Sequence, residues 1–90
     1  MDAEDRELFR NALLAQLDRA SAMGLAVRTL VIGARTAGFR TADDEAVRRE
    51  LEYLGDKGLA KKADKTLSPE NQRWRITAEG RDYLAVHGLA

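Results

Sequence analysis

The stretch VRRELEYLGDKGL (residues 47–59) sets the expected fold, because its apolar residues repeat as in a helix and then lead out of it. Three apolar side chains at positions i, i+4 and i+7 define one face of that helix: Val47, Leu51 and Leu54. Gly55 and Gly58 are suited to ending the helix. Leu59 then returns the chain to the core, so this stretch predicts an amphipathic helix that runs directly into an extended segment.

The residues before this stretch are typical of a helix start. We expect Thr41 to be the N-cap, with three carboxylates in the first turn: Asp43, Asp44 and Glu45. Carboxylates there accept hydrogen bonds from free backbone amides and complement the positive end of the helix dipole. Capping explains the acidic cluster more simply than a divalent-metal site does.

Two further helices are expected upstream. One covers about residues 4–22 and has a broad apolar face: Leu8, Phe9, Ala12, Leu13, Leu17 and Ala20. Leu14 falls off this face and is interpreted as a surface leucine or, alternatively, as part of a subunit contact. Residues 25–37 fit either a short buried strand or a helix. We favour the helix, because four residues follow the helical spacing: Val27, Leu30, Val31 and Ala34.

The C-terminal third changes to the period of a strand. Residues 59–67 are extended in character, residues 68–71 form a turn sequence, and residues 72–77 alternate. Trp74 and Ile76 share one face of the second strand, which predicts a β-hairpin with one buried side. Thr77 is the expected cap of a last helix over residues 78–87, in which three side chains close the core: Tyr83, Leu84 and Val86.

The predicted order of elements is helix, helix, turn, helix, hairpin, helix, which is that of a winged helix-turn-helix. Residues 47–59 resemble the recognition helix and first wing strand of prokaryotic winged-helix proteins. The stretch WRITAEGRDYL (residues 74–84) resembles the ending common in PadR-like and MarR-like regulators. The layout is also similar to small winged-helix proteins of Mu-like phages and prophages. The resemblance implies a single α+β, mainly helical domain over residues 1–90 that binds double-stranded DNA, as a small transcriptional regulator of bacterial or phage origin.

Charge is sorted along the chain although the formal net charge is zero. Residues 41–56 carry a net charge of −4, and residues 57–75 carry +4. Five cations belong to the predicted hairpin: Lys61, Lys62, Lys65, Arg73 and Arg75. Wings use such cations to bind phosphates, which gives sequence-independent, salt-sensitive affinity. The alternative is a solvated hairpin whose charges prevent edge-to-edge aggregation.

The expected recognition helix argues against strong DNA binding. Its outward face carries two arginines that would reach base edges, Arg48 and Arg49, beside two acids. Glu45 is placed to pair with Arg49, and Arg48 with Glu52, both at i, i+4. This pattern predicts weak, wing-dominated DNA binding, or else a winged helix that serves as a non-catalytic protein-interaction module. The module would bind through the acidic helix or through the first helix near Leu14. Its partner would be another protein or a second copy of this chain.

Nothing in the sequence predicts an enzyme, a metal site or a cofactor. The single histidine, His87, is interpreted as a solvated or helix-end residue, and the chain has no cysteine. Phosphate-binding loops, nucleophile elbows and metal-ligand spacings are missing from the sequence. The longest apolar run, residues 12–15, is far shorter than a membrane span, so a cytoplasmic protein without membrane contact is expected.

Overall fold

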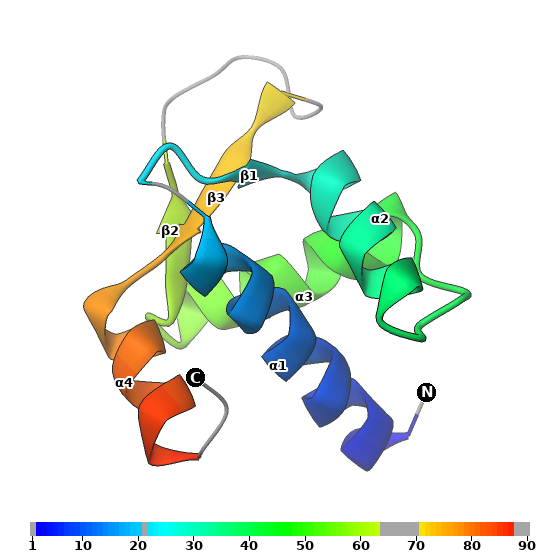
Figure 1. Cartoon of the computed structure of the whole chain (residues 1–90), viewed down its shortest axis with the longest axis horizontal. Helices are drawn as coiled ribbons and strands as arrows, with labels where there is room; N and C mark the ends of the chain where they lie inside the picture. Colours follow the sequence, from blue (N-terminus) through cyan, green and yellow to red (C-terminus); the bar gives the residue numbers. More distant parts are fainter. Residues whose placement is uncertain (1, 21, 64–70, 88–90) are drawn as a thin grey trace.

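The computed structural model describes residues 2–20, 22–63 and 71–87, and within them the chain forms four helices and three short strands. In chain order these are α1 (Ala3–Arg19), β1 (Leu25–Ala26), α2 (Val27–Thr36), α3 (Asp44–Asp56), β2 (Ala60–Lys62), β3 (Arg73–Ile76) and α4 (Ala78–Val86). In Figure 1, α1 crosses in front of α3, α2 lies on one side of them, and the sheet and α4 lie on the other. The fold is α+β and mainly helical, as predicted.

Helix α1 buries a face that is rotated from the one the sequence predicted, toward Leu14 and away from Leu8. Asp2 is its N-cap and accepts a hydrogen bond from the N–H of Asp5 at 2.8 Å. Leu14 is fully buried, whereas Leu8 is 54% exposed, so the predictions for these two leucines were wrong. Helix α1 contacts α2, α3, α4 and β3, and the positions of these neighbours, which the local sequence does not specify, decide which face is buried.

Residues 25–37 are mainly helical, as favoured, and the buried strand that the sequence also allowed through Val27, Leu30, Val31 and Ile32 is not formed. The first two residues of this range form β1, and α2 follows with the predicted buried face: Val27, Leu30, Val31 and Ala34. Gly24 permits the approach to the sheet, because its φ is +78° and a Cβ there would lie 2.3 Å from the carbonyl oxygen of Trp74. Helix α1 ends earlier than predicted, at Arg19, so Gly24 serves the strand and not the helix end.

The N-cap of helix α3 lies two residues later than predicted. Asp43, not Thr41, is the N-cap, and its Oδ1 accepts a hydrogen bond from the N–H of Ala46 at 2.8 Å. Phe39 anchors the turn before this helix, and the centroid of its ring lies 5.2 Å from the ring centroid of Phe9. This aromatic contact fixes the connection between α2 and α3 against the N-terminal half of α1.

The sheet has three strands in the order β1-β3-β2, all antiparallel, instead of the two-stranded hairpin that we predicted. Leu25 is opposite Trp74, which places β1 on the free edge of β3. A two-residue strand has too short an alternation to be recognised in the sequence. The predicted turn at residues 68–71 and the end of the predicted first strand fall mostly outside the described residues.

Helix α4 begins as predicted. The Thr77 side chain accepts a hydrogen bond from the N–H of Gly80 at 3.0 Å, and its hydroxyl donates to the carbonyl of Gly58 at 2.6 Å. Leu84 is fully buried and Tyr83 packs against the core, as predicted. Val86, in the last turn of α4, is 81% exposed, so its predicted core role was wrong.

Candidate nucleic-acid interface

The outward face of the sheet carries three of the predicted cations. Strand side chains alternate between faces, and β3 buries Trp74 and Ile76. Arg73 and Arg75 therefore lie on the opposite face, and Lys61 of β2 is directly opposite Arg75 in the register. Directly opposed residues of antiparallel strands share a face, so these cations form one group, which we call the cationic row.

The cationic row has no charge partner in the described part of the chain. None of Lys61, Arg73 and Arg75 has a carboxylate oxygen within 4.0 Å there. Lys61 and Arg73 are exposed, and Arg75 is half-buried. Uncompensated cations that share one sheet face produce a positive potential that attracts polyanions.

The other two hairpin lysines do not join this row. Lys62 is opposite Trp74 in the register, and its Nζ lies 5.8 Å from the ring centroid of that residue. This is within the range of a cation–π contact, so Lys62 covers the edge of the core on the inner face. Lys65 lies outside the described residues. The structure thus divides the predicted set of hairpin cations between two faces.

The outward face of α3 has one of the two ion pairs that we predicted. An Nη of Arg49 lies 3.2 Å from Oε1 of Glu45, with 69% and 83% of the two side chains exposed. The second pair, Arg48 with Glu52, is not formed within 4.0 Å in the described chain. An ion pair as exposed as that of Arg49 contributes little to stability, so it opens at small cost.

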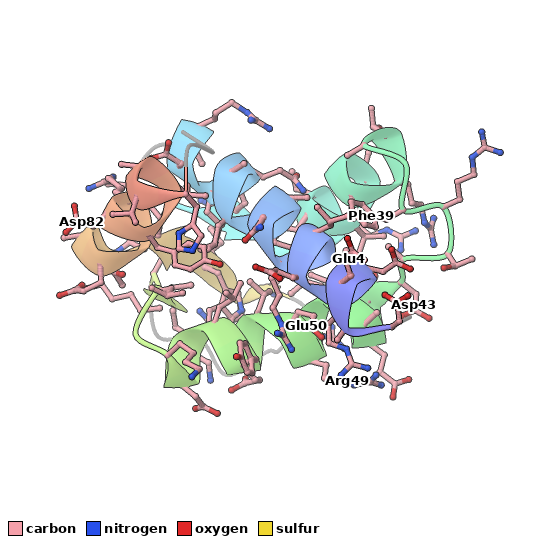
Figure 2. All side chains as sticks on the ribbon, turned by 90° about the horizontal axis from the view of Figure 1, so that it is seen from below. Glu4, Phe39, Asp43, Arg49, Glu50 and Asp82 are labelled. Atoms are coloured by element: carbon pink, nitrogen blue, oxygen red, sulfur yellow. The ribbon has the colours of Figure 1, made fainter. Side chains whose placement is uncertain are left out.

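Most of the acidic charge around α3 is engaged in the fold. Glu50 is buried between α1 and α3 (Figure 2), and its carboxylate lies 2.5 Å from Nε of Arg10 and 3.9 Å from Nε of Arg6. Asp44 pairs with Arg28 of α2 at 3.2 Å. The sequence reasoning missed these pairs. One signal was present for Glu50: it lies three residues after Val47, and this spacing places it on the buried face of α3.

The described residues contain neither a metal-site cluster nor a membrane-spanning helix. Within them, no three side chains of the metal-ligating types come together, and none of the helices has the length and apolar character to cross a membrane. His87 is exposed at the end of α4, where its ring stacks on Tyr83 at 4.1 Å. This agrees with the helix-end interpretation of the histidine.

Comparison with known families and curated proteins finds no relative of this chain. The chain matches no model of a known protein family, and a search of curated proteins found none with a similar sequence. The resemblance to winged-helix proteins therefore stays a prediction.

Proposed function

We propose that this chain is a winged-helix domain that binds double-stranded DNA mainly through its sheet, and that it acts as a small transcriptional regulator. The order of elements supports the fold assignment. A helix and a short strand precede the helix pair α2–α3, and a hairpin follows whose second strand pairs with β1. Helix pairs joined by a turn and followed by such a hairpin are the organisation of DNA-binding winged helices.

The observation that carries the proposal is the cationic row of Lys61, Arg73 and Arg75. These side chains share one face, and none has a carboxylate partner in the described chain. Cations of this kind bind phosphates by releasing counterions, which gives affinity without base specificity. The row therefore supports DNA binding that depends strongly on salt and weakly on sequence.

Helix α3 opposes this binding less than its composition suggests. Asp43 caps the helix, and arginines on α2 and α1 neutralise Asp44 and Glu50, respectively. Of the other three carboxylates in residues 41–56, Glu45 forms an exposed pair with Arg49, so Arg49 is available to a phosphate once the pair opens. Glu52 and Asp56 are exposed and have no cation within 4.0 Å in the described chain, so they stay unfavourable to DNA. The part of the protein-interaction alternative that used Leu14 loses support, because Leu14 is buried; the exposed leucine of the first helix is Leu8.

The test is a titration of a fluorescent random duplex of about 20 base pairs, followed by anisotropy between about 50 and 200 mM salt. The double variant Lys61→Gln/Arg73→Gln removes two exposed cations of the row. Its matched control, Arg19→Gln/Arg40→Gln, removes two exposed cations outside the sheet and α3 that form no ion pair in the described chain.

The row variant is expected to bind more weakly and to lower the slope of log K against log salt by about 1.8, since each phosphate contact contributes about 0.9. The control is expected to keep most of the wild-type slope. An absence of binding by the wild type at about 50 mM salt would falsify the proposal, because counterion release is most favourable there. An equal loss in both variants would show that only net charge matters and would remove the row from the interface.

A further inference from the structure

A cleft lies between α1, α3 and α4, away from the cationic row. Its volume is about 520 Å³, within the range of small-molecule sites. Its floor is apolar, formed by Leu14, Leu54 and Leu59, and two tyrosines also line it, Tyr53 and Tyr83. Figure 2 shows the three helices together.

Two residues of α1 that line the cleft, Glu7 and Asn11, each have a hydrogen-bond acceptor without a partner in the described chain. The Oδ1 atom of Asn11 is inaccessible to solvent and accepts no hydrogen bond. Glu7, one turn earlier on the same helix face, has no cation within 4.0 Å among the described residues. A buried carbonyl without a donor is unfavourable, so a rotation about χ2 of Asn11 that exchanged its oxygen and nitrogen positions would be favoured by a donor bound in the cleft. These acceptors favour a ligand group that carries several donors.

The cations of the cleft differ in what they are free to bind. Arg10 is engaged, since its guanidinium lies 3.7 Å from the ring centroid of Tyr53 and it pairs with the buried Glu50. Lys57, at the end of α3, is exposed, has no carboxylate within 4.0 Å in the described chain, and lies 5.7 Å from the same ring. The cleft thus presents acceptors on α1 and, at the C-cap of α3, an ammonium group that contacts the Tyr53 ring and has no carboxylate partner in the described chain.

We propose that this cleft binds a free α-amino acid with an apolar side chain. The ligand ammonium group donates to Asn11 Oδ1 and to the carboxylate of Glu7, and the ligand carboxylate pairs with Lys57. The side chain rests on the leucine floor between the two tyrosines. A zwitterion satisfies both polar sides at once, whereas an amine or an acid alone leaves one side unpaired.

The experiment is a titration of the full ¹⁵N-labelled chain with L-phenylalanine and L-leucine, followed by amide chemical shifts. Phenethylamine and 3-phenylpropionate lack one charged group each and serve as matched ligands. We expect shifts at residues that line the cleft, and binding of phenylalanine at least about tenfold tighter than of either matched ligand, because each omits an ion pair or hydrogen bond. Absence of shifts at about 10 mM amino acid, or equal binding of all three aromatic ligands, overturns the proposal.

Three single variants locate the ligand groups. Asn11→Leu, Glu7→Gln and Lys57→Gln are each expected to weaken phenylalanine binding at least about fivefold, whereas Lys61→Gln on the sheet leaves it unchanged. A thermal melt of Asn11→Leu checks folding. Since Glu7 and Lys57 are exposed, their variants test the site even if Asn11→Leu unfolds. Wild-type affinity in both exposed variants overturns the assignment. DNA binding is not involved in these measurements, so the two proposals fail independently.

Discussion

Replacing Gly80 with alanine places a methyl group where α4 packs against the residue before β2. An ideal Cβ at Gly80 would lie 2.2 Å from the carbonyl oxygen of Leu59 and 2.6 Å from Cγ1 of Ile76. The carbonyl cannot easily withdraw, because it belongs to the backbone and accepts a hydrogen bond from the N–H of Thr77 at 3.1 Å. Ile76 is buried, so its side chain has little room as well.

The size of the effect follows from two opposing terms. Overpacking of a tight site costs about 1–3 kcal/mol, and more where backbone must move. Alanine gains at most about 1 kcal/mol over glycine in a helix. Because the closest contact is with backbone, we expect a net loss of about 2 kcal/mol in the free energy of unfolding. For a domain of this size that loss lowers the melting temperature by about 8–16 °C.

Urea unfolding followed by circular dichroism measures this loss. The matched control is Gly55→Ala in α3, where an ideal Cβ would lie 3.4 Å from the Trp74 ring, an ordinary contact distance. The control is expected to be as stable as wild type or up to about 1 kcal/mol more stable. If Gly80→Ala behaves like the control, α4 does not pack on the Leu59 carbonyl as described.

Four further substitutions test other parts of the structure. Leu14→Ala is expected to cost about 2–5 kcal/mol in urea unfolding because it empties a fully buried site. Leu8→Ala, at a half-exposed site, should stay within about 0.5 kcal/mol, and the reverse order would restore the sequence-based assignment. Glu50→Ala should cost about 2 kcal/mol in the same assay, since it leaves the partly buried Arg10 of α1 without its carboxylate partner; an unchanged midpoint would count against the pair. Glu45→Gln frees Arg49 and removes an anion, so we expect severalfold tighter DNA binding by anisotropy, whereas weaker binding would contradict the role given to α3.

The helices could be predicted from the sequence because their signals are local. The buried face of α2 follows the spacing i, i+3, i+4, i+7, and the Thr77 cap lies directly before the first turn of α4. What failed depends on neighbours distant in the chain. Leu14 is buried because α1 contacts several elements, and β1 exists because β3 offers it an edge. Neither fact is encoded within one turn or one strand.

The candidate interface was predicted in composition but not in geometry. Alternation along β3 correctly placed Arg73 and Arg75 on the face of the sheet that Trp74 does not occupy. The strand register, which the sequence does not specify, then put Lys61 beside Arg75 and Lys62 on the other face. The pairing of Glu50 with Arg10 is out of reach for local reasoning, because the two residues are 40 positions apart.

These long-range pairs change how charge near α3 is interpreted. A count over residues 41–56 treats every carboxylate as an exposed anion. In the fold, however, Glu50 is 6% exposed and faces two arginines of α1, and Asp44 faces one of α2. Paired charges contribute little to the field that an approaching polyanion meets, whereas the cationic row has no such compensation in the described chain. The field of the domain is therefore set by which charges the fold pairs, and this is why we place DNA on the sheet rather than on α3.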